Sequence, residues 1–363
     1  MSVSPAASAS LRRLGWDPGF SSSKMGEVRG TEIVTHMVGA TVGLCVHTEE
    51  SGISLADVVR TPQRTLRPLR VAWPGYEYLV GADVGAYVRP VERLDLARFS
   101  DSSELRALLY ATLHKLLAGG VHRVGLVIAL PVEVLQDRLE AQRVERALAG
   151  WLVGQHEFSV DGEQARVEVC QVRARVAQPV ASWFDWGMDH TGQWVQGTEA
   201  LRAPTLVIDQ GYNTLDVLTV QGGQVSVRHT SGELLGMRRA AERLNALLAR
   251  RYRLELDLRS ADALIRRVVN GQRAETYVAG QAVDVTAEAQ QALSALVAEV
   301  CTFVERVVGR GRQFRVLLTG GGALALAPRL LELYPQALVL AEPVLANARG
   351  LAKLAVRPGF LAG

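Results

Sequence analysis

The sequence predicts an α/β protein with mixed sheets, and three observations carry that prediction. Helix-like and strand-like segments alternate along most of the chain. An Asp-x-Gly turn between two strands occurs near residue 17 and again near residue 209, which indicates a duplicated organisation. A Gly-Gly-Gly turn at residues 320–322 follows a further strand. With 363 residues, 48% of them hydrophobic, the chain is long enough for two domains.

Two periodicities divide the chain into elements. Loose alternation of apolar and polar residues predicts hairpin strands, and apolar residues every three or four positions predict helices. The leucine-rich helix, for example, can be capped by Ser102 or Ser103 and ended by Gly119. In chain order the patterns predict strands at 29–50 and 69–88, a helix at 102–119, a strand at 121–131, a helix at 132–150, strands at 157–176 and 203–229, helices at 232–252 and 286–308, a strand, turn and helix at 314–335, and a closing helix at 345–357.

Composition and charge argue against several classes of protein. The formal net charge is only +3, so we expect no direct binding of nucleic acid. Cys45, Cys170 and Cys301 are isolated, which fits neither a disulfide framework nor a zinc site, and we expect no structural or transition metal. No apolar run reaches the roughly 18 residues that span a bilayer. Residues 1–10 are predicted to form a disordered tail without a secretory signal. We therefore predict a cytoplasmic protein without a membrane partner.

The second Asp-x-Gly turn lies in the segment LVIDQGYNTLDVL. Asp209 ends a short apolar strand, and a buried aspartate is costly unless it binds a partner. A hydrated Mg²⁺ is a suitable partner, because magnesium keeps its waters and takes few carboxylates. Gly211 permits a tight reversal whose backbone N–H groups can hold phosphate oxygens. Thr214 and Asp216 follow on the next strand, where Asp216 could instead brace the hairpin.

The first turn, in LGWDPGFSSSKMGEV, has the same logic. Taken alone, Asp-Pro-Gly is ordinary surface-turn chemistry. Here Gly19 turns the chain after Asp17, and a run of serines offers hydroxyl groups. Lys24 is one of only three lysines in the chain and supplies a point charge suited to a phosphate. Two such hairpins facing each other would clamp a polyphosphate.

Taken in order, these turns resemble the motifs of the actin, sugar kinase and heat-shock chaperone ATPase superfamily. The resemblance covers residues 11–357 and implies the actin-like (ribonuclease H-like) two-domain fold, with nucleotide in the interdomain cleft. It implies domain I at 11–190, completed by the closing segment 343–363, and domain II at 203–342.

The resemblance also assigns roles to individual residues. Asp17 and Asp209 would hold Mg²⁺ through water, and Asp209 would also be catalytic. The remaining contacts to ATP or GTP would come from a set of glycines and polar residues in the three turns and in the segment SGELLG: Gly19, Ser21, Ser22, Lys24, Gly211, Asn213, Thr214, Gly232, Glu233, Gly320, Gly321 and Gly322.

Two further segments favour the plasmid-segregation actins (ParM/StbA) and the related archaeal actins. Gln178 lies where actins carry a glutamine and plasmid actins a glutamate, so by resemblance it would orient the attacking water. An ordinary polar residue before a proline is the alternative. The segment EPVLANARGLAKLA is similar to the closing helix of that group. Tyr212 departs from the pattern, which commonly has glycine there, although Asn213 can still adopt a left-handed conformation.

The resemblance implies a nucleotide-hydrolysing protein that assembles head to tail into filaments for plasmid or DNA segregation. DNA would be reached through an adaptor protein. A small-molecule kinase, a non-filamentous scaffold or chaperone-like ATPase and a cell-shape actin are the alternatives. The tryptophan-rich segment 181–204 is predicted as a loop that either packs beneath the interdomain hinge or contacts another subunit.

Overall fold

The computed structural model describes residues 10–45, 67–91, 99, 102–309 and 313–361. The chain divides into two compact units. Unit 1 consists of Met1–Ala129, Leu139–Arg175 and Leu351–Gly363, and unit 2 of Leu130–Arg138 and Val176–Gly350. Residues 130–138, 176–190 and 343–350 belong to unit 2, whereas the sequence placed them in domain I. The predicted tail, apart from Ser10, and the predicted strand residues 46–50 lie outside the described residues. In the described part of the chain, no helix has the length and apolar character needed to cross a membrane.

Unit 1 is built on a nine-stranded sheet with the order β3-β2-β1-β7-β9-β8-β5-β6-β4. β1 lies near one side, antiparallel to β2 and parallel to β7, so the first Asp-x-Gly turn follows a strand with neighbours on both sides. The strands are β1 (Leu11–Pro18), β2 (Ser22–Arg29), β3 (Glu32–Gly39), β4 (Val42–Leu44), β5 (Leu69–Trp73), β6 (Tyr76–Val80), β7 (Gly120–Leu130), β8 (Gly154–Val160) and β9 (Glu163–Ala177).

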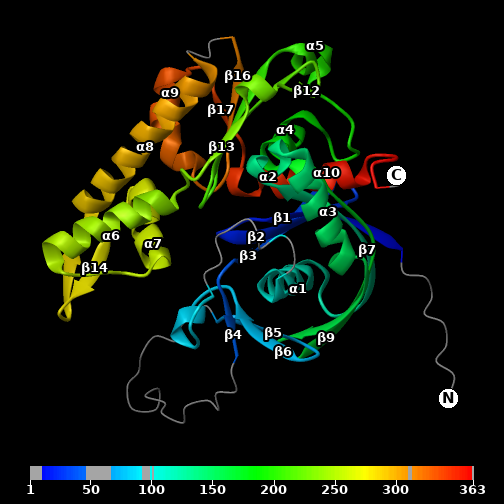
Figure 1. Cartoon of the computed structure of the whole chain (residues 1–363), viewed down its shortest axis with the longest axis horizontal. Coiled ribbons are helices and arrows are strands. Elements are labelled where there is room, and N and C mark those ends of the chain that lie inside the picture. The colour runs from blue at the N-terminus through cyan, green and yellow to red at the C-terminus, as the bar shows by residue number, and fades with distance from the viewer. Residues whose placement is uncertain (1–9, 46–66, 92–98, 100–101, 310–312, 362–363) are drawn as a thin grey trace. The chain divides into compact units, whose positions relative to one another are not determined.

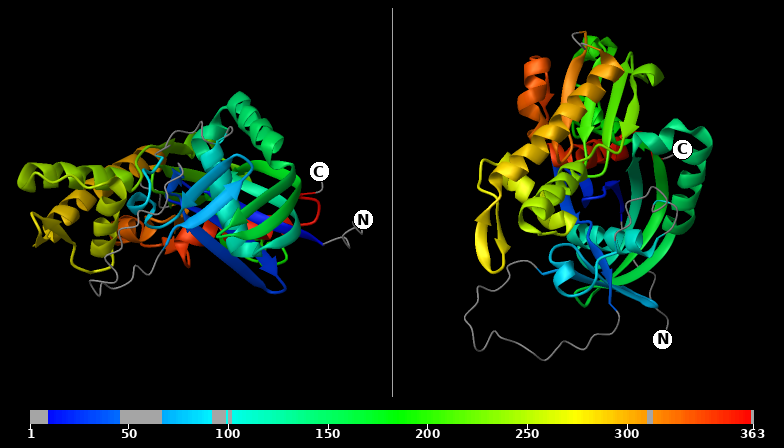
Figure 2. Two further views of the ribbon diagram at one scale, coloured as in Figure 1. Left: turned by 90° about the horizontal axis from the view of Figure 1, so that it is seen from below. Right: turned by 60° about the vertical axis from the view of Figure 1, so that its left-hand side comes forward.

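Helix α1 (Ser103–Leu117) packs against this sheet, which curves around it (Figures 1 and 2). The Ser102 hydroxyl caps the helix by accepting a hydrogen bond from the Leu105 amide, as the sequence predicts. The predicted helix at 132–150 is instead two helices, α2 (Val132–Gln136) and α3 (Arg138–Leu152), because Asp137 between them is extended. A short 3₁₀ turn, η1 (Val84–Ala86), follows β6.

Unit 2 contains a six-stranded sheet with the order β12-β11-β10-β16-β17, to which β13 adds beside β11. β10 is antiparallel to β11 and parallel to β16, so the second Asp-x-Gly turn and the Gly-Gly-Gly turn follow neighbouring parallel strands at the same edge. The strands are β10 (Thr205–Gln210), β11 (Leu215–Gln221), β12 (Gln224–Val225), β13 (Ser231–Glu233), β16 (Arg315–Thr319) and β17 (Leu338–Val339).

The helices of unit 2 include a mutually packed group, α6, α7 and α8 (Figure 1). α8 matches the predicted helix at 286–308 residue for residue. α7 and the hairpin β14–β15 do not belong to any predicted element. The remaining bounds are α6 (Arg238–Tyr252), α7 (Leu258–Val269), α8 (Thr286–Val308), α9 (Ala323–Leu333), β14 (Glu275–Val278), β15 (Gln281–Asp284), η3 (Val227–His229) and η4 (Pro343–Leu345).

The tryptophan-rich segment 181–204 is not a loop. It contains most of α4 (Gln178–Gly187), the short helix α5 (Gly197–Arg202) and a bridge between them. Trp183 is buried in the core formed with Val207 and Leu317, and its ring lies 4.5 Å from that of Trp194. A Cβ on Gly187 would lie 2.0 Å from the Trp194 ring. Within unit 2, this segment therefore packs over the sheet. Its place beneath an interdomain hinge and its contact with another subunit both stay predictions.

Candidate functional site

Asp17 and Lys24 face each other across the β1–β2 hairpin as register partners. Lys24 Nζ donates a hydrogen bond to Asp17 Oδ2 over 2.9 Å. Asp17 is fully buried, and the Lys24 side chain is 12% exposed. This ion pair supplies the counter-charge that a buried carboxylate requires. A phosphate bound at this turn would therefore compete with Asp17 for the Lys24 ammonium group.

Close packing holds the turn between β1 and β2. A Cβ on Gly19 would lie 2.9 Å from the Ser22 carbonyl oxygen and 3.1 Å from Lys24 Nζ, so a side chain there would press on both. The Ser21 carbonyl accepts a hydrogen bond from the Ala40 amide, which ties the turn to the end of β3. The Ser22 residue is buried at the start of β2. Gly19, Ser21, Ser22 and Lys24 thus lie together on this turn, as the sequence predicts.

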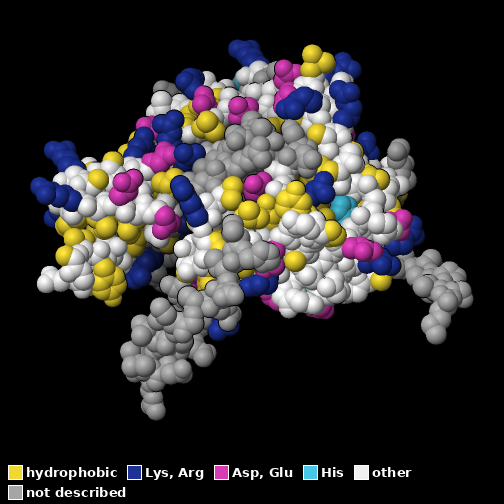
Figure 3. Space-filling model, turned by 60° about the horizontal axis from the view of Figure 1, so that its bottom comes forward, with side chains coloured by type: hydrophobic (Ala, Val, Ile, Leu, Met, Phe, Trp, Pro, Cys, Tyr) yellow, Lys and Arg dark blue, Asp and Glu magenta, His cyan; other side chains and the backbone are white. Residues whose placement is uncertain are grey.

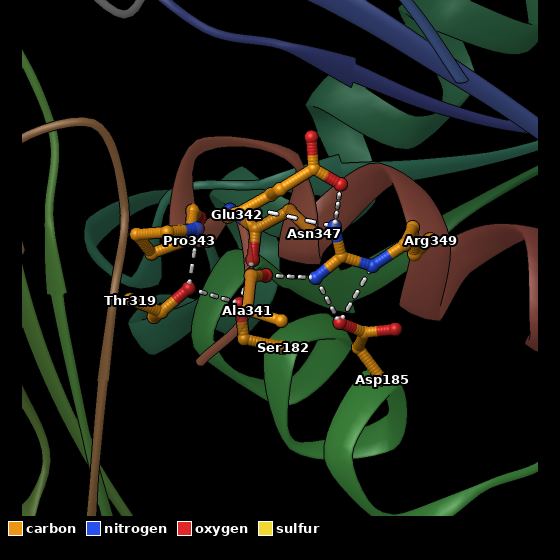
Figure 4. A network of polar contacts seen from close by, with 8 residues as sticks. All are labelled: Ser182, Asp185, Thr319, Ala341, Glu342, Pro343, Asn347 and Arg349. Atoms are coloured by element: carbon orange, nitrogen blue, oxygen red, sulfur yellow. Dashed lines mark hydrogen bonds and ion pairs between the residues drawn. The ribbon is translucent and has the colours of Figure 1, made fainter. Parts of the chain in front are cut away.

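Asp209 is the penultimate residue of β10 and is 5% exposed. Asn347 Nδ2 of α10 (Ala346–Val356) donates a hydrogen bond to Asp209 Oδ2 over 2.9 Å. Ser182 Oγ donates to Asn347 Oδ1 over 2.6 Å and lies 2.8 Å from Thr319 Oγ1 (Figure 4). The predicted catalytic aspartate is thus attached to a buried polar network that joins α4, β16 and α10.

The loop from Gly211 to Thr214 is fixed by the start of α6. The Gly211 amide donates to the Thr214 carbonyl over 2.9 Å, closing the turn. The carbonyl groups of Gly211, Tyr212 and Asn213 then accept hydrogen bonds from the amides of Met237, Arg238 and Gly236. Neither Gly211 nor Asn213 has a positive φ, so the loop does not use the left-handed conformation suggested for Asn213.

Tyr212, the departure from the family pattern, is accommodated within this loop. Its side chain is buried, and the guanidinium of Arg259 lies over its ring, 4.6 Å from the centroid. A Cβ on Gly236 would lie 2.1 Å from the Tyr212 carbonyl oxygen, so the α6 segment approaches the loop more closely than any side chain allows. The missing glycine therefore does not open the turn.

Asp216 is the register partner of Asp209 on β11 and is almost completely buried. Its Oδ1 accepts a hydrogen bond from the Val132 amide over 3.1 Å, and its Oδ2 accepts one from Thr214 Oγ1 over 3.1 Å. Burial, followed by the negative charge of Asp209, raises the pKa of Asp216 to about 7. These contacts support the bracing role that the sequence offered as one possibility for Asp216.

This raised pKa predicts a pH-dependent stability. The folded protein binds the Asp216 proton more tightly than the unfolded chain does. Protonation of Asp216 therefore stabilises the folded state fully below the ordinary pKa of 3.8, and this stabilisation is lost as the pH rises through about 7. Asp216→Asn keeps an acceptor for the Val132 amide and removes the titration. We expect its melting temperature to fall less than that of the wild type between pH 5.5 and 9, because the wild type loses about 2 kcal/mol of stability, at about 1.4 kcal/mol per unit, between pH 5.5 and the folded pKa of about 7. Parallel melting curves for the two proteins would contradict this assignment.

Gly232 and Glu233 lie in β13, not at the start of the helix predicted at 232–252. Gly232 pairs with Asp216, and a Cβ on Gly232 would lie 2.9 Å from Asp216 Oδ1. Glu233 pairs with Leu215, and its carboxylate forms an exposed ion pair with Arg306 over 3.6 Å. Because residues 231–233 pair with β11 as a strand, they are not helical, and α6 begins only at Arg238. The structure thus brings Gly232 to the predicted hairpin and turns the Glu233 side chain toward Arg306.

The Gly-Gly-Gly turn packs directly against the Asp209 hairpin. Gly320 has a φ of +87°, and a Cβ there would lie 2.2 Å from Asp209 Oδ1. The Gly322 amide donates to the Gln210 carbonyl over 2.8 Å, and a Cβ on Gly322 would lie 2.4 Å from Gln210 Cγ. The Gly321 carbonyl accepts a hydrogen bond from Arg266 of α7 over 3.3 Å. A side chain at position 320 or 322 would therefore collide with residues of β10, so glycine is required at both positions.

Gln178 is the first residue of α4 and is 9% exposed.

Within unit 2 the structure brings together Asp209, its turn, Gly232 and the Gly-Gly-Gly turn. Among the described residues, no group of three or more His, Cys, Asp or Glu side chains could hold a metal ion.

Sequence reasoning did not assign roles to Asn347, Ser182 and Thr319. Asn347 contacts Asp209 across a separation of 138 residues, and Ser182 contacts Thr319 across 137. The one signal available was the Asn-x-x-Gly spacing in the closing helix, where Gly350 allows the close approach of α10 to α4. A Cβ on Gly350 would lie 1.8 Å from the Ala181 carbonyl oxygen.

Comparison with known proteins identifies the family of these motifs. Residues 15–180 match the family model for the N-terminal domain of actin-like proteins, and residues 207–332 match the model for the C-terminal domain of the archaeal actin homologue MreB-like proteins. Compared by sequence alone, no curated protein matches the chain.

Solved structures show the same fold at low sequence identity. Ta0583, an archaeal actin homologue in complex with ADP, is 16% identical with a TM-score of 0.68, covering 93% of this chain and 97% of that chain. A non-polymerisable quadruple mutant of pCBH ParM is 15% identical with a TM-score of 0.71, covering 95% and 98%. Bacillus thuringiensis ParM with AMPPNP is 11% identical with a TM-score of 0.63, covering 94% and 97%. The chain is therefore an actin-like protein with the fold of ParM and the archaeal actin homologues.

Proposed function

We propose that this chain is a cytoplasmic ATPase that binds a nucleoside triphosphate with Mg²⁺ and polymerises head to tail into filaments. The observation that carries the proposal is the buried Asp209 carboxylate, held between Asn347 and the Gly320 backbone at the end of β10. The two similar proteins that contain ADP and AMPPNP support nucleotide binding. The pCBH ParM variant described as non-polymerisable supports a role in assembly.

The residues present suit a nucleotide with magnesium. A side chain at Gly320 would press on the Asp209 carboxylate, and one at Gly232 would press on the carboxylate of its register partner, Asp216. A bound Mg²⁺ would supply positive charge to offset the negative charge that develops during phosphoryl transfer. Asp17 and Asp209 would hold its water shell, while Lys24, Ser21, Ser22, Gly211 and Thr214 would bind phosphates, and Gly320 to Gly322 would lie against the nucleoside.

We further propose that the filaments serve plasmid or DNA segregation through a separate DNA-binding adaptor. On the face drawn in Figure 3, Lys and Arg side chains are interspersed with Asp and Glu side chains. The modest net charge of +3 also favours an indirect contact with DNA, because direct phosphate binding usually requires a clustered basic surface.

Ligand-dependent thermal stability tests the nucleotide part of the proposal. We expect ADP with Mg²⁺ to raise the melting temperature, because a ligand at 100 times its Kd stabilises the folded state by about 2.7 kcal/mol. ATP and GTP, each with and without Mg²⁺, establish the nucleotide preference and the metal requirement. An unchanged melting temperature with every nucleotide at millimolar concentration would refute nucleotide binding.

Gln178 is expected to act in hydrolysis and not in binding. Because a residue that orients the attacking water acts at the chemical step, Gln178→Ala should lower kcat for phosphate release by about 10²-fold. The Kd for nucleotide should remain near that of the wild type. Gln164→Ala, at an exposed position of β9, serves as the matched control. Unchanged kcat in Gln178→Ala would show that Gln178 is an ordinary polar residue at a helix start.

A further inference from the structure

We propose that Asn347 is the positioning residue for the Asp209 carboxylate. This inference rests on the proposed function for its catalytic meaning, but the contact itself can be tested without nucleotide. Asn347 and Asp209 are 6% and 5% exposed, and Asn347 Nδ2 lies 2.9 Å from Asp209 Oδ2. The other carboxylate oxygen, Asp209 Oδ1, lies so close to the Gly320 backbone that a Cβ on Gly320 would be 2.2 Å from it. The carboxylate is therefore held from two sides.

Hydrogen-bond chemistry fixes the orientation of the Asn347 amide. An ionised carboxylate can only accept, so the NH₂ group of Asn347 must face Asp209. The amide oxygen then faces Ser182, whose hydroxyl donates to it over 2.6 Å. Since the Ser182 proton is used in this bond, the 2.8 Å contact with Ser182 Oγ depends on the Thr319 proton, for which the Pro343 carbonyl oxygen is a second acceptor at 3.2 Å from Thr319 Oγ1. The Pro343 carbonyl, near Thr319, still accepts from the Gly320 amide over 3.0 Å.

The backbone that carries Asn347 is itself anchored. Two residues beyond Asn347, Arg349 binds Asp185 Oδ2 of α4 through Nε over 3.0 Å and Nη2 over 2.6 Å (Figure 4). Gly350 then lies against the Ala181 carbonyl, where no side chain would fit. The first part of α10 is thus fixed to α4, so the Asn347 amide has little freedom to follow Asp209 if that side chain moves. Asn347 therefore sets the place of the carboxylate, as positioning requires.

An exchange of the two side chains tests the contact. Asn347→Asp would place two carboxylates against each other and should lower the melting temperature strongly. The double variant Asp209→Asn with Asn347→Asp restores one amide and one carboxylate, and Ser182 can still donate to residue 347. We expect the double variant to recover most of the stability lost in Asn347→Asp, measured without nucleotide or Mg²⁺. If Asn347→Asp does not fold, recovery of a folded protein by the double variant gives the same answer.

Hydrolysis provides the second readout. We expect Asn347→Ala to lower kcat for phosphate release by about 10- to 100-fold, because a displacement of about 1 Å can cost that much, while the Kd for nucleotide changes less than about threefold. The exchanged double variant should remain inactive, since its carboxylate is on the wrong element. Asn245→Ala is the matched control. Asn245 also bonds through both ends of its amide, to the Leu256 backbone, and should keep the wild-type kcat.

The outcomes separate this inference from the proposed function. If the wild type releases no phosphate, the proposed hydrolysis fails, and stability recovery in the double variant still decides whether Asn347 holds Asp209. If the wild type is active but Asn347→Ala keeps its kcat, Asn347 is not a positioning residue and the proposed function stands. Failure of the double variant to recover any stability would overturn the contact in solution.

Discussion

Asp209→Asn is expected to lower the rate of nucleotide hydrolysis by about 10²- to 10³-fold, the usual cost of removing one preorganised electrostatic group. Asn has nearly the same shape as Asp, and an amide at residue 209 can still present an oxygen to Asn347 Nδ2. The fold should therefore survive while the charge that would hold the Mg²⁺ shell is lost. Phosphate release at saturating nucleotide, with a melting curve on the same preparation, measures both effects.

Glu199→Gln is the control for this substitution. It also removes one carboxylate from unit 2, but that side chain is 89% exposed on α5. Its hydrolysis rate should equal that of the wild type. A wild-type rate in Asp209→Asn would remove Asp209 from the proposed site, and with it the observation on which the proposed function depends.

Gly320→Ala is expected to damage both stability and activity. Its φ of +87° is unfavourable for alanine, and the new Cβ would lie 2.2 Å from Asp209 Oδ1 and 2.5 Å from the Gln210 carbonyl oxygen. Asp209 cannot simply rotate away, because Asn347 holds its other oxygen. Backbone strain of this kind costs about 1–3 kcal/mol, and overpacking adds about as much again. We expect a clear loss of melting temperature together with a reduced hydrolysis rate.

Gly280→Ala separates the two causes. Gly280, in the β14–β15 hairpin, has a φ of +80° with no atom within 4 Å of its Cβ position. Gly280→Ala should lose only the stability that alanine at a positive φ costs, and it should keep the wild-type hydrolysis rate. Equal losses of stability in the two variants would mean that the contact of Gly320 with Asp209 contributes nothing.

The sequence predicted best where a local pattern carried the information. Apolar periodicity predicted α8 at its exact bounds, and the Asp-x-Gly segments are indeed the hairpins β1–β2 and β10–β11. The ion pair between Asp17 and Lys24 joins residues seven apart on one hairpin, but the sequence analysis assigned Lys24 to a phosphate and did not predict the pair. The assignments of these residues to nucleotide and magnesium stay predictions.

Long-range packing explains what the sequence could not supply. The helix predicted to begin at Gly232 begins at Arg238, because Gly232 pairs with β11 first. The tryptophan-rich segment was predicted as a loop, yet α4 forms there, with Trp183 buried in the core of unit 2. Asn347 and Asp209 meet through the fold alone, across 138 residues, and no local motif marks their contact.

Light scattering of the purified protein, followed together with phosphate release, tests the central claim most directly. With Mg²⁺ and ATP or GTP, the account predicts a rapid rise in scattering, delayed phosphate release, and recovery of the polymer in a high-speed pellet. Protein without nucleotide, and Asp209→Asn with nucleotide, should show neither the rise nor the release. Phosphate release without scattering at any protein concentration would contradict a filament-forming ATPase and favour a kinase or scaffold of the same fold, which a screen of acceptor molecules would then distinguish.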